Sequence, residues 1–158
     1  MRILVVSDTH GKNKELIESL NQKEKPDLLF HLGDYVRDGI ILADELKLSS
    51  IIVRGNGDHP SSGFREEEVL EIKGKKIYLT HGHKLGVNFN LNRIFYRARE
   101  LRADIALFGH THIPIVEEKE GILFMNPGSV SLPRDGSNKK TYGIIKIGEK
   151  TEIEIKEV

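Results

Sequence analysis

Residues 2–11, with the sequence RILVVSDTHG, join a short apolar run to a polar cluster that ends in glycine. The run at residues 2–7 is continuous and rich in β-branched side chains, as expected of a strand buried on both faces of a parallel sheet. Residues 12–23 then place apolar side chains at helical spacing, and residues 27–32 form a second apolar run. The sequence therefore predicts a parallel βαβ unit, in which His31 of the second strand is expected to be a core histidine.

The same alternation continues after the second strand. Residues 36–47 predict a helix whose Ile40, Ala43 and Leu46 face the sheet, and residues 50–54 predict a third strand. Parallel strands need crossover connections, which are right-handed in nearly all proteins. This part of the chain therefore predicts a parallel sheet covered by helices.

The remainder of the chain changes character. Residues 67–72 and 75–80 flank Lys73-Gly74 and predict a hairpin, and residues 91–101 carry the clearest helical stripe of apolar side chains. Further strands are predicted at residues 104–108, 113–118, 122–125, 142–147 and 151–156. A parallel half followed by an antiparallel half predicts an α/β fold, a four-layer αββα sandwich of two mixed β-sheets flanked by helices. One domain is expected over residues 1–158, because no repeat or linker divides the chain.

The composition excludes several classes of protein. The 158 residues include 24 lysines and arginines and 24 aspartates and glutamates, so the formal net charge is zero. Proteins that capture nucleic acid or anionic membranes through bulk charge usually have a basic excess, so neither activity is expected. The chain has no cysteine and seven histidines, so a bound metal would be held by nitrogen and oxygen alone. No secretory signal or membrane-spanning segment is recognised, and a cytoplasmic location is expected.

Polar clusters follow five of the apolar runs. If the five strands lie side by side, the clusters meet at the carboxyl edge of the sheet, where ligands bind in open α/β folds. The collected side chains are two carboxylates, four imidazoles and one amide. They are Asp8, His10, Asp34, Asn56, His81, His110 and His112.

This set of side chains favours a centre with two metal ions. Seven ligands are too many for one tetrahedral zinc, and four histidines are too many for magnesium or calcium alone. Two divalent ions that share a bridging carboxylate would use all seven ligands. Such paired ions bind a phosphoryl group and lower the pKa of a bridging water, which generates hydroxide.

Each motif alone has a simpler interpretation. Asp8 could cap the next helix, and Gly33-Asp34 could form an ordinary turn. Gly55-x-Gly57 could belong to a dinucleotide loop, although Pro60 stands where the third glycine is required. The metal centre is favoured because the motifs occur together at successive strand ends.

The ordered motifs resemble those of the calcineurin-like metallophosphoesterases, and the small size of the chain resembles their minimal YfcE-type phosphodiesterase family. The motifs are Asp8-x-His10, Gly33-Asp34, Gly55-Asn56, His81-Gly82-His83, Gly109-His110-x-His112 and Asn126-Pro127-Gly128-Ser129. The resemblance implies the same αββα sandwich. It also implies a dinuclear metal-dependent phosphoesterase, more readily a phosphodiesterase than a monoesterase. In this reaction a metal-bridging hydroxide, rather than a protein nucleophile, attacks phosphorus in line with the leaving oxygen.

The resemblance further implies how the ligands divide. One ion would be held by Asp8, His10, Asp34 and His112, and the other by Asp34, Asn56, His81 and His110, with Asp34 as the bridge. The cofactors would be two divalent metal ions from the group of manganese, nickel, iron, zinc and magnesium, with manganese favoured. The expected partner is a small phosphodiester or nucleotide-like substrate, and homo-oligomerisation is left open.

One position departs from the family pattern. Gly57 occupies the place where many members carry a histidine that binds the phosphate or protonates the leaving group. Substrates with good leaving groups or metal-assisted departure are therefore expected. Two nearby residues are auxiliary candidates. Asp58 either orients a ligand or forms a turn, and His83 either contacts substrate or supports His81.

Two other functions are open at this point. The retromer subunit that shares this fold binds proteins, so the chain could be a non-catalytic metal-binding scaffold or interaction module. A complete set of seven ligands argues against that alternative. A nucleotide-binding regulatory domain is disfavoured, because neither a P-loop nor a full G-x-G-x-x-G motif is present.

Overall fold

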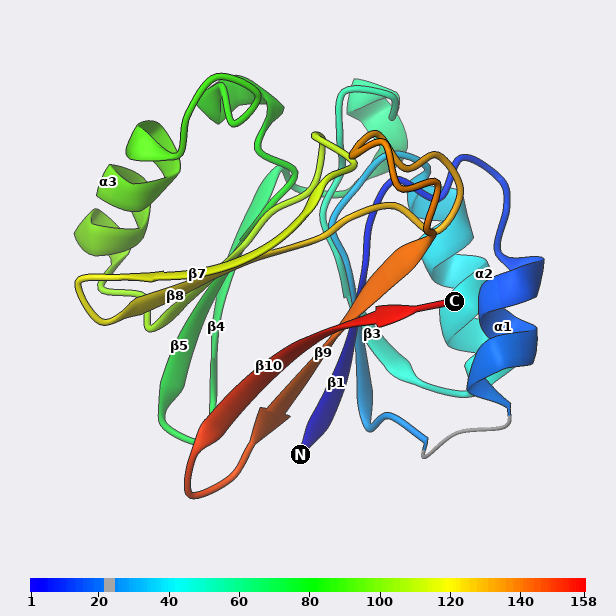
Figure 1. Ribbon diagram of the computed structural model, residues 1–158, viewed down its shortest axis with the longest axis horizontal. Coiled ribbons are helices and arrows are strands. Elements are labelled where there is room, and N and C mark those ends of the chain that lie inside the picture. Colours follow the sequence, from blue (N-terminus) through cyan, green and yellow to red (C-terminus); the bar gives the residue numbers. More distant parts are fainter. Residues whose placement is uncertain (22–24) are drawn as a thin grey trace.

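The computed structural model describes residues 1–21 and 25–158. In these ranges ten strands form two five-stranded sheets that pack face to face, with helices on both outer faces (Figure 1). This arrangement confirms the α/β four-layer αββα sandwich that the sequence predicts.

The first sheet contains both ends of the described chain. Its strands are β1 (Arg2–Val6), β2 (Leu28–His31), β3 (Ser49–Ile52), β9 (Thr141–Ile147) and β10 (Thr151–Glu157). Their order is β10-β9-β1-β2-β3, with β1, β2 and β3 parallel and β9 antiparallel to both of its neighbours. The βαβαβ start predicted from the sequence is therefore confirmed.

The second sheet comes from the middle of the chain. Its strands are β4 (Glu67–Ile72), β5 (Lys75–Thr80), β6 (Ile105–Leu107), β7 (Pro114–Lys119) and β8 (Ile122–Pro127), in the order β4-β5-β6-β8-β7. Strands β5, β6 and β8 are parallel, and β4 and β7 are antiparallel edges. The predicted hairpin joins β4 and β5, and its Lys73 and Gly74 have φ angles of 50° and 74°. Positive φ at both central residues is the conformation of a type I′ turn.

Three apolar clusters hold the layers together. Ile3 and Val5 of β1 face the core between the two sheets, whereas Leu4 and Val6 face the helices, as the two-residue period of a strand requires. The helices on the first sheet are α1 (Lys14–Leu20) and α2 (Val36–Leu46), and α3 (Asn92–Leu101) covers the second sheet. Two short 3₁₀ turns, η1 (Pro60–Ser62) and η2 (His83–Leu85), lie between these elements.

The predicted inward face of α2 was wrong at one position. Ala43 and Leu46 are buried, but Ile40 is 42% exposed. The helix instead turns Gly39 toward β2, where a Cβ atom would lie 2.9 Å from Cγ of His31. Because the backbone approaches the histidine ring this closely, the buried stripe passes through Gly39 and leaves Ile40 outside.

The helix predicted at residues 12–23 is shorter than expected in the described part. It begins at Lys14 and ends at Leu20. Residues 22 and 23 of that prediction lie outside the described residues. Among the described residues, no helix combines the length and apolar character needed to cross a bilayer.

Candidate metal centre

The polar clusters come from both sheets, and this differs from the single edge expected from the sequence. Three clusters follow β1, β2 and β3 of the first sheet, and two follow β5 and β6 of the second. The carboxyl ends of these strands nevertheless lie close together across the two sheets. The backbone N–H of His110 donates to Oδ2 of Asp8 at 3.0 Å, and Nδ1 of His81 donates to the carbonyl of Leu32 at 2.8 Å.

An unusual backbone conformation marks these strand ends. Five of the seven candidate ligands have φ between 46° and 70°, in the left-handed region. They are Asp8, His10, Asp34, His110 and His112. Residues with a side chain adopt this conformation at a cost, and such residues concentrate at functional sites, where the surrounding structure holds them.

Glycine allows the strand ends to come together. A Cβ atom on Gly109 would clash with Oγ of Ser7, and a Cβ atom on Gly55 would clash with Oδ1 of Asp34. The side chains of Ser7 and Asp34 therefore pack directly against the backbone of Gly109 and Gly55. Any other residue at these two positions would force them apart.

The first group of candidate ligands is Asp8, His10 and His112. Each offers one ligand atom, and these atoms lie within 4.8 Å of one another. Nε2 of His112 is 3.2 Å from Oδ1 of Asp8 and 3.4 Å from Nε2 of His10. Nδ1 of His112 donates to the carbonyl of Leu132 at 2.7 Å, so its Nε2 lone pair is directed toward Asp8.

The second group is Asp8, Asp34 and His81, whose ligand atoms also lie within 4.8 Å of one another. Nε2 of His81 is 3.5 Å from Oδ1 of Asp34 and 3.9 Å from Oδ1 of Asp8. Because Nδ1 of His81 donates to the carbonyl of Leu32, its Nε2 also presents a lone pair to the carboxylates. Asp8 is common to both groups.

Two atoms at the centre of the site show that a cation fits these residues. Oδ1 of Asp8 and Nε2 of His81 are buried, and neither has a hydrogen-bond partner among the described residues. Both are electron-pair donors in this arrangement, so bringing them together without a cation is unfavourable. Carboxylate oxygen and imidazole nitrogen are the donors that borderline divalent metals accept.

The remaining candidate ligands lie at the rim. The ring of His110 is 5.1 Å from that of His81, and its Nε2 lies 2.8 Å from Nδ2 of Asn88. Asn56 is exposed, and the N–H of the next residue, Gly57, donates to Oδ1 of Asp34 at 2.7 Å. Asn56 is thus carried by a loop that is attached to Asp34.

The protein environment lowers the pKa of Asp8, His10 and His110, whereas the neighbouring Asp8 outweighs burial and raises the pKa of His112. Burial alone raises the pKa of Asp8, but His112, His81 and Ser7 outweigh it and lower the pKa below its ordinary value. Burial also lowers the pKa of His10 and His110. Asp8 is therefore a carboxylate at neutral pH, and these two histidines are neutral, which are the forms that bind metal.

Within the described residues, the auxiliary residue Asp58 forms hydrogen bonds with backbone N–H groups only. Its Oδ1 accepts from the N–H groups of Tyr35 and Val36 at 2.9 and 2.8 Å, and its Oδ2 accepts from Gly55 N–H at 2.9 Å. Asp58 therefore joins the Asn56 loop to the amino end of α2, where a carboxylate also stabilises the helix dipole.

The other auxiliary residue, His83, faces the candidate centre. Its ring lies 5.4 Å from that of His81 and 6.1 Å from that of His110. Its Nδ1 is buried and has no hydrogen-bond partner among the described residues. Burial lowers the pKa of His83, so the ring is neutral at neutral pH.

His31 lies beneath this centre and confirms the prediction of a core histidine. It is fully buried, with Nε2 3.2 Å from Oγ1 of Thr9 and Nδ1 accepting from Gly33 N–H at 3.3 Å. Burial lowers the pKa of His31 to about 4.

The supporting roles of several residues were not predicted from the sequence. Ser7 donates to Oδ2 of Asp8 at 2.6 Å, and Ser129 and Ser131 donate to the carbonyl of Asp8 at 2.8 and 3.1 Å. Ser129 belongs to the Asn126-Pro127-Gly128-Ser129 motif, to which the sequence assigned no role, and no motif contains Ser131. Asn88 likewise has no sequence signal, because its partner His110 is distant in the sequence.

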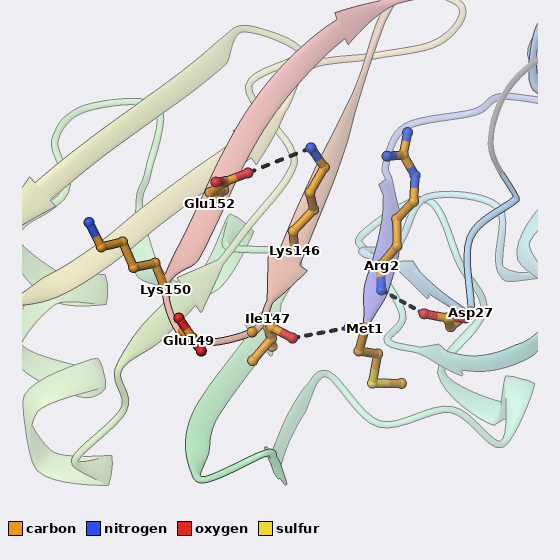
Figure 2. Close-up of a pocket in the computed structure, with 9 residues that line it drawn as sticks. Met1, Arg2, Asp27, Lys146, Ile147, Glu149, Lys150 and Glu152 are labelled. Atoms are coloured by element: carbon orange, nitrogen blue, oxygen red, sulfur yellow. Dashed lines mark hydrogen bonds and ion pairs between the residues drawn. The ribbon is translucent and has the colours of Figure 1, made fainter.

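A separate hollow lies at the opposite end of β1 (Figure 2). This cavity of about 610 Å³ is lined by Met1, Arg2, Asp27, Lys146, Ile147, Gly148, Glu149, Lys150 and Glu152. In Figure 2, Asp27 accepts from the backbone N–H of Arg2 at 2.7 Å, and Lys146 lies 3.5 Å from Glu152. None of the candidate ligands lines it.

Comparison with known proteins identifies relatives of this chain. Residues 1–150 match the calcineurin-like phosphoesterase superfamily domain. The probable metallophosphoesterase YsnB of Bacillus subtilis is 39% identical over 135 residues, which are 85% of this chain and 78% of that protein. The phosphodiesterase YfcE of Escherichia coli is 29% identical over 170 residues, covering 92% of this chain and 87% of that protein.

Solved structures agree with these relatives about the fold. A predicted phosphoesterase from Streptococcus pneumoniae has a TM-score of 0.82 and 34% identity, over 98% of this chain and 87% of that chain. Vps29 of Entamoeba histolytica, solved in complex with Zn²⁺, has a TM-score of 0.81 and 22% identity over 99% of both chains. At that identity, the similarity to Vps29 shows the fold alone.

Proposed function

Since the chain belongs to the calcineurin-like phosphoesterase superfamily, we propose that it is a phosphodiesterase that depends on two divalent metal ions. The observation that carries the proposal is the unsatisfied pair formed by Oδ1 of Asp8 and Nε2 of His81, which lie 3.9 Å apart. A cation between these two donors would remove the cost of burying them without partners. The name of the relative YfcE supports the choice of a phosphodiester over a monoester.

We assign the ligands as the family pattern divides them. One ion would be held by Asp8, His10, Asp34 and His112, and the other by Asp34, Asn56, His81 and His110. The bridging role of Asp34 rests on this pattern, and the position of its carboxylate 3.5 Å from His81 is compatible with it. Asp8 lies close enough to both groups to be the alternative shared ligand.

When bound, two divalent ions activate water at neutral pH and neutralise the charge that develops on the phosphoryl oxygens. The residues of the chain keep the donors in place for this task. The carbonyls of Leu32 and Leu132 fix the tautomers of His81 and His112, and Ser7 holds Asp8. Donors that are oriented before substrate arrives need little reorganisation during the reaction.

Gly57 leaves this chain without the family histidine beside Asn56, so proton donation to the leaving group must come from elsewhere. His83 is the imidazole nearest to that task, because its Nδ1 is unpaired and its ring faces His81. Burial lowers its pKa, so at neutral pH the ring carries no proton to give as a general acid and would position substrate by hydrogen bonding. We therefore propose substrates with good leaving groups.

The first test is hydrolysis of bis(p-nitrophenyl) phosphate by protein that has been stripped with chelator and reloaded with manganese. Nickel, zinc, iron and magnesium are tried in parallel, because the nitrogen and oxygen donors do not select one of them. We expect turnover with metal and none without. A protein that binds two equivalents of metal and gives no rate above buffer would disprove the catalytic proposal.

The same experiment separates the enzyme from a non-catalytic scaffold. The fold is also that of Vps29, a protein named for vacuolar sorting, so the architecture alone does not decide the matter. A scaffold would bind metal without hydrolysis. For a scaffold, Asp34→Asn would lower the metal content, while hydrolysis would stay at the rate of buffer in both the wild type and the variant.

A further inference from the structure

The segment that connects η2 to α3 forms a cavity beside the candidate metal centre. The cavity has a volume of about 430 Å³ and is lined by residues 83–86, 89, 90 and 93. His83 belongs both to this lining and to the group of rings around His81, so the cavity opens directly beside the place proposed for the phosphodiester. A substituent of the substrate ester would extend into it.

Phe89 is the most unusual residue of the lining. It is 89% exposed, more than any other large hydrophobic side chain in the described ranges. The turn beneath it is ordered by a hydrogen bond from Phe89 N–H to the carbonyl of Gly86 at 2.9 Å, and a Cβ atom on Gly86 would lie 3.6 Å from Cδ2 of Phe89. The backbone of the turn is thus ordered, and it presents the Phe89 ring with its face open to solvent, as a stacking platform requires.

The charge of the cavity favours an anion. Lys84 is paired with Glu66 at 2.7 Å, and Glu66 also binds Arg54 at 2.6 Å. Arg93, in the first turn of α3, makes no hydrogen bond or ion pair with any residue that the structure describes. The cavity therefore combines an open aromatic face with an uncommitted guanidinium, which binds phosphate well.

We infer that this cavity is the subsite for the nucleoside portion of a nucleotide phosphodiester. The inference rests on the proposed function and names its substrate class. The base stacks on Phe89 while its phosphodiester lies at the metal centre, and Arg93 pairs with a further phosphate, such as the terminal phosphate of a 5′-phosphorylated dinucleotide. An alkyl ester would gain nothing from either group.

The first experiment compares two substrates that share a leaving group, thymidine 5′-(p-nitrophenyl) phosphate and methyl p-nitrophenyl phosphate. We expect wild-type protein loaded with manganese to prefer the thymidine ester in kcat/KM. Phe89→Ala should reduce that preference by about 5- to 100-fold, through KM, which is the range that stacking of a base on an aromatic side chain supplies. Tyr96→Ala is the matched control, because Tyr96 is 65% exposed on α3 and does not line the cavity.

The second experiment measures binding of pTpT and TpT to the metal-loaded protein by calorimetry. These dinucleotides differ only in one terminal phosphate. Arg93→Gln should weaken pTpT about tenfold and abolish its advantage over TpT, as the loss of one charge-assisted contact predicts. Arg102→Gln, at the other end of α3, serves as control.

These outcomes distinguish the subsite from the proposed function. If neither ester is hydrolysed but dinucleotide binding depends on Phe89 and Arg93, the catalytic proposal fails and the subsite stands. If both esters are hydrolysed equally well by wild type, or if Phe89→Ala lowers both rates by the same factor, the subsite is disproved.

Discussion

The two ends of β1 differ in burial, in backbone conformation and in how their charged groups are paired. At the carboxyl end, Asp8 is fully buried and has a left-handed backbone. At the amino end, Met1 is 38% exposed and its amino group donates to the carbonyl of Ile147 at 3.0 Å. There Lys146 pairs with Glu152 at 3.5 Å, and Asp27 accepts from the backbone N–H of Arg2 (Figure 2).

The difference shows that cavity volume is a poor guide to a functional site. The hollow at the amino end measures about 610 Å³, but the ion pair that lines it, Lys146–Glu152, is exposed to solvent. Such pairs contribute little to stability or to binding. The carboxyl end instead keeps strained backbone and unsatisfied buried donors, whose cost the rest of the fold must offset. A bound cation would explain both features.

The largest effect should come from Asp34→Asn. The amide has the same shape as the carboxylate but no charge to share between two ions, so we expect the chain to bind one equivalent of metal or less. Hydrolysis should fall by at least about 100- to 1,000-fold. Metal content is measured by elemental analysis and rate with bis(p-nitrophenyl) phosphate. Glu152→Gln at the amino end of β1 is the control. An equal loss of metal content and hydrolysis in both variants would contradict the placement of the metal site at the carboxyl end.

Glycine substitutions test the close packing of the carboxyl end in terms of stability. A methyl group on Gly109 would clash with Oγ of Ser7, so Gly109→Ala should lower the free energy of unfolding by about 1–3 kcal/mol or more. Gly148 borders the other hollow, and a Cβ atom there would have its nearest neighbour at 3.9 Å. Gly148→Ala should therefore stay within about 0.5 kcal/mol of wild type in urea unfolding without metal. Equal destabilisation by the two variants would contradict the argument.

Acid should lower the free energy of unfolding through His31, which lies beneath the candidate metal centre. The pKa of His31 is about 4 in the folded chain, below its ordinary value of 6.5. Between these values the unfolded state binds more protons, so the free energy of unfolding falls as pH drops from about 6.5 toward 4. The contribution is about 1 kcal/mol for each pH unit.

Two measurements isolate this residue from the other histidines. Histidine resonances in NMR report its protonation directly, and we expect the His31 ring to remain neutral at pH 5.5. In urea unfolding without metal, His31→Gln should have a shallower pH dependence than wild type, whereas the exposed His59→Gln should retain the wild-type slope. A His31 ring that titrates near 6.5 would refute the prediction.

The strand ends could be predicted from the sequence because burial and turn chemistry are local properties. The run at residues 2–7 and the polar cluster after it were identified correctly, since a doubly buried strand leaves a continuous apolar signal. Ile40 was misplaced because the determining contact is tertiary, between Gly39 and His31. Spacing alone cannot show that a helix approaches a sheet through its glycine.

The sequence indicates which candidate ligands lie close together better than it indicates how the fold arranges them. The candidate ligands Asp8, Asp34, His81 and His112 do lie together, but they come from two sheets rather than one edge. The left-handed backbone of Asp8, Asp34 and His112 has no sequence signal, because it is imposed by the loops that meet there. Partners such as Asn88 depend on long-range packing and carry no motif.

A smaller effect is expected from Asn88→Ala. The amide of Asn88 lies 2.8 Å from Nε2 of His110 and holds the ring at the rim of the centre. Removal of such a supporting partner typically weakens metal binding by about tenfold or more. Asn88→Asp should not restore the affinity, because a carboxylate has no N–H to donate to Nε2 of His110. Calorimetric titration of stripped protein with manganese or zinc is the measurement, and equal affinity in Asn88→Ala would exclude this role.

The smallest effect is expected where the other hollow is altered. Lys146 lies 3.5 Å from Glu152 and 3.8 Å from Glu154, and these side chains are 37–60% exposed. Solvent screens such pairs, so Lys146→Met should change the free energy of unfolding by about 0.5 kcal/mol or less. Metal content and hydrolysis should match wild type, because no candidate ligand lies near this end of β1. If Lys146→Met lowered metal binding, the two ends would be energetically coupled, and strain and unsatisfied donors would no longer suffice to locate the site.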